Sequence, residues 1–137
     1  MTHKILCAID GTEHGKAAVD AAAELSRISG AKLEIALVNA MLGGTRGPGI
    51  LAHDDKEADA VVTEAAAEAK KKGAIQVSST VLKARDIAEA LVRYADDTGV
   101  DHIVTGTGGK NALSRLVLGS VATSVVNRAH CAVTVAR

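Results

Sequence analysis

A glycine-rich stretch near the carboxyl end of the chain has the residue types that hold phosphate groups. Residues 106–122 read GTGGKNALSRLVLGSVA, in which the glycines are Gly106, Gly108, Gly109 and Gly119. Glycine loses more conformational freedom on folding than any other residue, so this cluster indicates a backbone that must come close to something. Behind it, Ser120 is a candidate N-cap, and the free amides of Val121 and Ala122 would direct a partial positive charge at an anion. The pattern predicts a phosphate-binding loop at the start of a helix.

A carboxylate follows the first apolar run of the chain and could face the same loop. In the segment AIDGT, Asp10 stands where the run stops, and Gly11 permits a sharp turn. The glycine-rich stretch likewise leaves an apolar run, at Thr105. In an open α/β sheet, ligands bind beyond the carboxyl ends of the strands, where the strand order reverses. We therefore expect Asp10 and the glycine-rich stretch to meet at one edge of a sheet.

Short apolar runs of strand length alternate with stretches of helical periodicity along the chain. The expected strands cover residues 4–9, 32–38, 75–82, 102–105 and 131–136. Between them, apolar residues recur at helical spacing within residues 18–28, 58–69, 87–94 and 121–129. Such alternation, joined by right-handed crossovers, favours a parallel sheet covered on both faces. The 137 residues are therefore predicted to form one α/β domain, residues 1–137, with a Rossmann-like, doubly wound fold of five parallel strands and four helices.

The composition argues against several classes of partner. Basic and acidic residues both number 16, so the formal net charge is zero and no basic surplus favours DNA, RNA or a lipid surface. Phe and Trp are absent and Tyr94 is the only aromatic residue, so there is no platform on which bases could stack. No apolar run is long enough for a secretory signal or a membrane span. We expect a cytoplasmic protein with neither nucleic-acid nor membrane partners.

Other motifs that carry chemistry are incomplete. Cys7 and Cys131 stand far apart without CxxC spacing, and the five histidines are scattered, so neither a disulfide framework nor a zinc site is predicted. The segment GTEHGK, residues 11–16, is one residue short of a Walker A loop, and alanine follows its lysine. The segment GTGGKN lacks the acidic residue that a dinucleotide fingerprint requires about 20 positions later. Neither a P-loop nor a dinucleotide site is supported.

One irregular segment interrupts the alternation of strands and helices. Residues 39–52, NAMLGGTRGPGILA, hold four glycines and the only proline. A mobile surface loop is the favoured interpretation, and an ordered lid over the site is the alternative. Arg46 would reach a phosphate only if the segment folded over the site.

The spacing of the glycines resembles that of a known family. Gly106, two residues, Gly109, nine residues, then Gly119 and Ser120 reproduce the G-2X-G-9X-G(S/T) pattern of the ATP-binding branch of the universal stress proteins. The segments ILCAIDGTEHG, DHIVTGTGG and CAVTVAR also look like that family's first, fourth and last strands. The likeness covers the whole chain. It implies that the glycine-rich stretch holds the ribose and phosphates of ATP, or of another adenine nucleotide such as AMP.

The resemblance also implies roles for individual residues. Asp10 would make polar contacts near the ribose and could hold magnesium with ATP, and the backbone at Val38 would lie against adenine. Gly106 would pack under the ribose, and the later glycines would surround the phosphates. The implied nucleotide-binding residues are Ala8, Asp10, Val38, Thr105, Gly106, Gly109, Lys110, Gly119, Ser120, Val121 and Ala122. The family pattern leaves position 108 free.

Hydrolysis of ATP is expected to be slow or absent. Phosphoryl transfer needs a base or a positioned water, and the sequence offers no obvious base near the phosphates. The resemblance therefore favours a nucleotide-dependent signalling or stress-response module. One alternative is a slow ATPase or another adenine-nucleotide enzyme, although an ATP pyrophosphatase would carry SGGxDS where this chain has DGTEHG. The other alternative is an interaction module that binds an unknown protein partner without using nucleotide.

The last expected strand suggests how the protein assembles. It is apolar on both faces and would lie at a sheet edge, which is an aggregation hazard unless the edge is covered or paired. The family resemblance implies that two copies pair these strands antiparallel in a twofold homodimer, with Val133 and Val135 near the axis.

Overall fold

The computed structural model describes residues 2–12, 14–43, 49–108 and 118–137. Apart from one additional short strand, strands and helices alternate along these residues, as the periodicity predicts. The strands are β1 (Lys4–Ile9), β2 (Lys32–Leu42), β3 (Ile50–Leu51), β4 (Ile75–Ala84), β5 (His102–Gly106) and β6 (Ala132–Ala136). The helices are α1 (His14–Ser29), α2 (Asp55–Lys71), α3 (Ile87–Thr98) and α4 (Ser120–Arg128). None of the helices in this part of the chain is long and apolar enough to cross a membrane.

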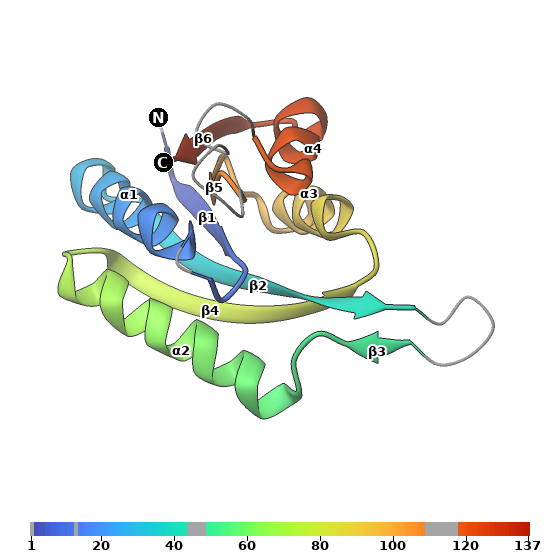
Figure 1. Ribbon diagram of the computed structural model, residues 1–137. Helices are drawn as coiled ribbons and strands as arrows, with labels where there is room; N and C mark the ends of the chain where they lie inside the picture. The colour runs from blue at the N-terminus through green and yellow to red at the C-terminus, as the bar shows by residue number, and fades with distance from the viewer. Residues whose placement is uncertain (1, 13, 44–48, 109–117) are drawn as a thin grey trace.

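Five of the strands form a parallel sheet in the order β4, β2, β1, β5, β6. The short strand β3 pairs antiparallel with the end of β2. The chain builds outward from β1 through β2 to β4 and then returns to build β5 and β6 on the other side of β1 (Figure 1). The strand order therefore reverses between β1 and β5. This topology confirms the predicted α/β, doubly wound fold with four helices.

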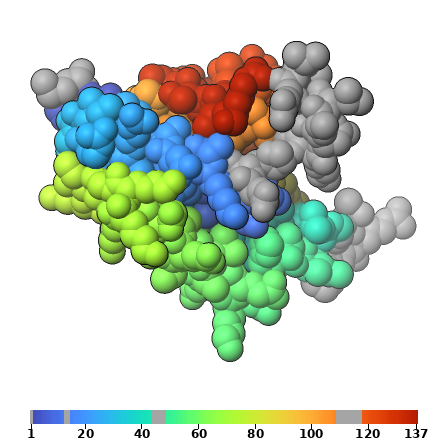
Figure 2. Space-filling view, turned by 60° about the vertical axis from the view of Figure 1, so that its left-hand side comes forward, coloured from blue at the N-terminus to red at the C-terminus, as the bar shows by residue number. Residues whose placement is uncertain are grey.

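Helices cover both faces of the sheet, because the side chains of each strand alternate between the faces. Ile5 and Cys7 pack with α1 and α2, whereas Leu6 and Ala8 pack with α3 and α4. Figure 2 shows α1 and α2 side by side. Cys7 is fully buried, and burial raises the pKa of its thiol to about 12. Cys7 is thus an inert core residue, as predicted, while Cys131 is only partly buried.

Two helices begin at aspartate caps that the sequence encodes as D-x-x-E. Asp54 accepts a hydrogen bond from the amide of Glu57 at 2.7 Å, and Asp86 accepts one from the amide of Glu89 at 3.0 Å. These hydrogen bonds hold the pKa of both aspartates below the usual range. At its other end, α3 stops at Gly99, whose φ of 73° is the left-handed conformation that favours glycine. The limits of these helices are therefore set by local sequence.

The segment 39–52 is more regular than its glycines suggest. β2 is 11 residues long and continues into this segment, and β3 pairs with its end so that Met41 lies opposite Leu51. The expectation of a loop is therefore wrong at both ends of the segment. The described glycines of the segment, Gly43 and Gly49, lie just outside β2 and β3 and do not interrupt either strand. Residues 44–48, including Arg46, lie outside the described part of the chain.

A β-bulge lies at the start of the edge strand β4. Lys32 of β2 pairs with Ile75, but Leu33 pairs with Val77, so Gln76 is an extra residue. The φ of Gln76 is 47°, and no other described residue except glycine has a positive φ. An L-residue pays roughly 1–2 kcal/mol in this left-handed region. The bulge therefore stores strain at one position.

We expect Gln76→Gly to raise the free energy of unfolding by up to about 1 kcal/mol, because glycine relieves the strain but loses more entropy on folding. Ser78→Gly is the matched control. Ser78 is exposed on the same strand, outside the positive-φ residues, so its replacement should lower the free energy of unfolding by about 0.5–1 kcal/mol. Urea denaturation measures both changes. An equal loss in the two variants would contradict strain at Gln76.

Candidate functional site

A cavity of about 340 Å³ opens where the strand order reverses, between the carboxyl ends of β1, β2 and β5 and the helices α3 and α4. Most of the predicted site residues line this cavity. They are Ala8, Asp10, Val38, Thr105, Gly106, Gly119, Ser120, Val121 and Ala122. Gly109 and Lys110 lie outside the described residues, so their roles stay predictions. The fold thus gathers segments that are far apart in the sequence around one cavity.

Small and β-branched side chains of the strands form the floor of the cavity. Ala8 of β1 pairs with Ala36 of β2 on one side and with Thr105 of β5 on the other. Val38 follows Ala36 by two residues, so it faces the same side of the sheet. The short side chain of Ala8 at the centre leaves space above the sheet. The floor can therefore accept a flat apolar group.

Asp10 stands at the rim of the cavity, in a turn that its own side chain holds. Its Oδ1 accepts hydrogen bonds from the amide of Thr12 at 2.9 Å and from the hydroxyl of Thr12 at 2.5 Å. Gly11, between them, has a φ of 82°, which glycine adopts without strain. The Asp10 side chain is exposed. A carboxylate held in this way can accept a hydroxyl hydrogen bond or contact a hard cation.

The backbone that leaves β5 passes directly against the start of α4. The amide of Gly119 donates to the carbonyl oxygen of Thr107 at 2.6 Å. A Cβ at position 119 would lie 2.9 Å from that oxygen and 3.0 Å from the carbonyl oxygen of Gly108. Glycine is therefore required at 119 by the close approach of two backbone segments. Gly108 has a φ of 71°, so glycine is favoured there too, although the family pattern leaves that position free.

The first turn of α4 presents its amides to the cavity. Ser120 is the predicted N-cap, but the structure has Gly119 at that position, with no side-chain cap hydrogen bond. The prediction is wrong by one residue because Gly119 is still extended, with φ −64° and ψ 166°, while α4 already includes Ser120. The first amides of a helix have no partner within the helix. Here they belong to Ser120, Val121 and Ala122, which line the cavity, so this end of α4 offers donors and partial positive charge.

An apolar wall of the cavity comes from α3 and was missing from the predicted site. Ile87 and Leu91 lie one turn apart on α3 and both line the cavity. Their helical spacing is visible in the sequence, but spacing alone does not show which face of the sheet a helix covers. The wall faces a cavity whose other side carries the amides of α4. The arrangement suits a ligand with an apolar part and an anionic part.

A buried amide holds the end of β2 beside Val38. Asn39 is fully buried, and its side chain donates to the carbonyl oxygen of His53 at 2.8 Å and accepts from the His53 amide at 3.0 Å. These two hydrogen bonds connect the segment between β3 and α2 to β2. The sequence gives no sign of this pair of hydrogen bonds, because asparagine in a glycine-rich segment is typical of a turn. Asn39 thus supports a strand that lines the cavity.

A second cavity, of about 470 Å³, lies between α1 and α2 and is a weaker candidate. Apolar residues such as Val19 and Val61 line it. Its rim mixes carboxylates with lysines, and Lys72 forms an ion pair with Asp20. Mixed charges of this kind are typical of a solvated helix surface. Nothing about this rim selects a ligand of one charge.

Metal binding in the candidate site depends on Asp10. The described residues contain no group of three or more histidine, cysteine, aspartate or glutamate side chains that could hold a metal ion. Magnesium usually takes one or two carboxylates and completes its shell with phosphate oxygens and water. A single carboxylate at the rim therefore fits a magnesium ion that arrives with a nucleotide, and not one that is held by the protein alone.

Comparison with known sequences gives one family. The pattern that defines the universal stress protein family matches residues 1–137. The universal stress protein YxiE of Bacillus subtilis is 30% identical over 148 aligned residues, which take in 100% of both chains. A shorter match of 50 residues, 46% identical, joins the chain to universal stress protein MJ0531 of Methanocaldococcus jannaschii and takes in 36% of this chain and 29% of that protein.

Comparison with solved structures extends the likeness to the whole fold. A universal stress protein solved in complex with cAMP is 26% identical to this chain and superposes with a TM-score of 0.77. The match covers 99% of this chain and 97% of that one. The fold that surrounds the cavity is therefore shared over nearly its full length.

Proposed function

This chain belongs to the universal stress protein family, and we propose that the cavity at its strand-order reversal binds an adenine nucleotide. The observation that carries the proposal is the meeting, in one cavity, of the uncapped amino end of α4 and the apolar wall of α3. The first suits a phosphate and the second suits a base. The relative solved with cAMP, 26% identical, supports the same class of ligand.

In the proposed complex, each part of the nucleotide has its own surroundings. The phosphates lie against the first turn of α4, where amides without helical partners favour negative charge. The base lies between Val38 and Leu91, and Asp10 accepts a hydrogen bond from the ribose. Gly109 and Lys110 complete the proposed set of binding residues. The cavity volume of about 340 Å³ falls within the range of about 300–1,000 Å³ for small-molecule sites.

ATP is the nucleotide that we propose, with AMP as the alternative. The proposal of ATP rests on the glycine spacing that the chain shares with the ATP-binding branch of the family. Magnesium would come with the phosphates of ATP, and Asp10 would be its protein ligand.

We further propose a nucleotide-dependent stress-response or signalling module that acts in the cytoplasm. Of the described residues that line the cavity, Asp10 alone has an ionisable side chain, and its Oδ1 already accepts two hydrogen bonds. A general base must reach the attacking water, and Asp10 sits at the ribose end of the proposed complex. The site therefore favours binding over rapid hydrolysis.

We also propose a homodimer that forms through β6. Among the described strands, β6 pairs only with β5, so its outer edge carries unpaired backbone groups. Val133 and Val135 lie opposite Ile103 and Thr105 in the register of this pair. Antiparallel pairing with the β6 of a second copy, related by a twofold axis, would give these backbone groups hydrogen-bond partners.

Val121→Asp tests the position of the phosphates. A carboxylate in the first turn of α4 complements the helix dipole, so the variant should fold, but it should repel a phosphate. At about a hundredfold excess of ATP or AMP over the Kd, the wild-type protein should gain about 2.7 kcal/mol, which raises Tm by several degrees. Val121→Asp should not respond.

Val121→Asn is the matched control for this experiment, because it has nearly the same size without the charge. It should keep most of the increase in Tm. A wild-type protein that ignores every adenine nucleotide would refute nucleotide binding. An equal response from the aspartate and asparagine variants would refute the position of the phosphates.

ATP turnover should be negligible, because Asp10 is the one ionisable side chain among the described residues that line the cavity. Release of inorganic phosphate from ATP with magnesium, followed over hours, measures it. Multiple turnovers per minute that Asp10→Ala abolishes would show that the protein is an ATPase.

Val135→Lys tests the homodimer. A charge at the centre of a strand-to-strand interface should be poorly tolerated, since it would lie against its own copy near the twofold axis. Light scattering should give a dimer for the wild-type protein at micromolar concentration and a monomer for the variant. The β6 interface would be refuted by a wild-type monomer, or by a variant that remains dimeric.

A further inference from the structure

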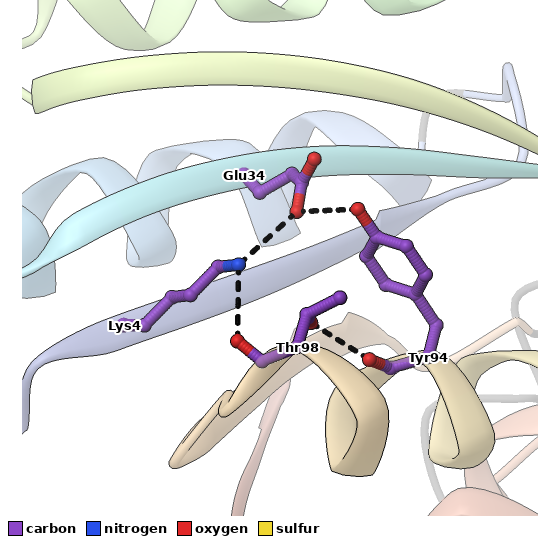
Figure 3. Close-up of polar contacts among 4 residues, drawn as sticks. All are labelled: Lys4, Glu34, Tyr94 and Thr98. Carbon is purple, nitrogen blue, oxygen red and sulfur yellow. Dashed lines mark hydrogen bonds and ion pairs between the residues drawn. The ribbon is translucent and has the colours of Figure 1, made fainter.

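A polar network joins α3 to the sheet (Figure 3). It lies on the same face as the cavity, because Glu34 and Val38 of β2 are an even number of residues apart and Val38 lines the cavity. The hydroxyl of Tyr94 donates to Oε1 of Glu34 at 2.8 Å. Nζ of Lys4 lies 3.7 Å from the same oxygen and donates to the carbonyl oxygen of Thr98 at 3.2 Å. Three elements, β1, β2 and α3, therefore meet at one carboxylate.

Glu34 is an unusual residue for the inner face of a sheet. It is 8% exposed, and it is the only charged residue among the buried residues described. A buried carboxylate is unfavourable unless it is paired and hydrogen-bonded. Well-packed apolar side chains in place of such a network are often equally stable or more stable. Stability alone therefore does not require a carboxylate at this position.

The two partners of this hydrogen bond belong to elements that line the cavity. On β2, Glu34 precedes Val38 by four residues and faces the same side, roughly 13 Å away along the strand. On α3, Tyr94 continues the helical stripe of Ile87 and Leu91. Val38, Ile87 and Leu91 all line the cavity. The bond therefore fastens one lining element to another, about one turn beyond Leu91.

We propose that Tyr94 and Glu34 form a positioning clamp that holds α3 against β2 and so sets the distance between Leu91 and Val38, where the base would bind. Neither clamp residue touches the nucleotide. Lys4 keeps the Glu34 carboxylate in place and also anchors the carboxyl end of α3 through Thr98. The inference rests on the proposed function, because the base of an adenine nucleotide is the group that would bind between Val38 and Leu91.

Tyr94→Phe tests the clamp, because it removes one hydroxyl and keeps the ring. If the clamp holds the wall in its binding position, the loss of this hydrogen bond should weaken AMP binding about fivefold in calorimetric titration. Glu34→Gln keeps an oxygen that accepts from Tyr94, so it should retain most of the affinity. Glu34→Leu, with no acceptor, should bind as weakly as Tyr94→Phe.

Asp54→Ala is the matched control for lost stability. It removes one hydrogen bond at the cap of α2, on the opposite face of the sheet, and so destabilises the fold without touching the clamp. AMP affinity should equal that of the wild-type protein. A fall in affinity that merely follows stability would appear in this control as well.

The ionisation of the Tyr94 hydroxyl gives a second test. If Tyr94 only stabilised the fold, AMP would leave its titration midpoint unchanged. Burial and the neighbouring Glu34 raise the pKa of Tyr94, while a hydrogen bond with Thr80 lowers it. Glu34 and Lys4 are the charged groups of the network that holds the Tyr94 hydroxyl. The charged residues that line the same surface pocket as Tyr94 are Lys83, Arg85, Asp86, Glu89, Arg93 and Asp97. Binding and clamping are reciprocal, so a nucleotide that needs the clamp must also strengthen it. Saturating AMP should therefore raise the titration midpoint of tyrosinate absorbance, which belongs to Tyr94 alone because it is the only tyrosine.

The clamp and the proposed function can fail separately. Tyr94→Phe that binds AMP as tightly as the wild-type protein, or a midpoint that AMP leaves unchanged, overturns the clamp and leaves nucleotide binding intact. Wild-type protein that binds no adenine nucleotide overturns the proposed function. In that case hydrogen exchange of the α3 amides decides the clamp. Faster exchange in Tyr94→Phe, with β1 unaffected, supports it, and unchanged exchange overturns it.

Discussion

The pairing of β1 along both of its edges is the constraint on which the rest of the structure depends. β1 lies between β2 and β5, and Ile5, Leu6 and Cys7 at its centre are fully buried, so its side chains must serve both faces of the sheet. The chain leaves β1 towards α1 on one face and leaves β5 towards α4 on the other. Two neighbouring strands that diverge in this way open a space at their carboxyl ends. The cavity is thus a consequence of topology, and the side chains around it determine what it accepts.

The core side chains are small, and this explains why the fold also uses hydrogen bonds between its elements. The chain has no Phe or Trp, and α1 buries Ala18, Ala22 and Ala23 against the sheet. Alanine lets a helix come close, but it buries little apolar area and gives the contact little direction. Hydrogen bonds are directional, so they can fix the position of a helix or strand where apolar packing alone would let it shift. The Tyr94 hydroxyl places α3 in this way, and the Asn39 amide places the end of β2.

Local patterns predicted the fold well, whereas features that depend on contacts between distant segments were missed. The run at residues 4–9 became β1 without change, because a buried parallel strand is a continuous apolar run. The antiparallel pairing of β2 and β3 is not evident from the sequence, because the glycines of residues 39–52 are typical of a loop. The wall of Ile87 and Leu91 and the partners of Asn39 were missed for another reason. Each depends on which helix or loop the sheet brings near, and local sequence patterns do not show that.

The three helices whose starts are described differ in how their first amides are satisfied, and the difference has a steric cause. Asp54 and Asp86 supply a carboxylate oxygen to α2 and α3. α4 has Gly119 in that place, where a Cβ would lie 2.9 Å from a backbone oxygen of the segment that leaves β5. Every residue that caps through its side chain has a Cβ, so the close passage of this segment excludes a cap of that kind. The helix end without a carboxylate cap is also the one whose first three residues, Ser120, Val121 and Ala122, all line the cavity. In the proposed complex, the phosphate of the nucleotide takes the place that an aspartate takes at the other two helices.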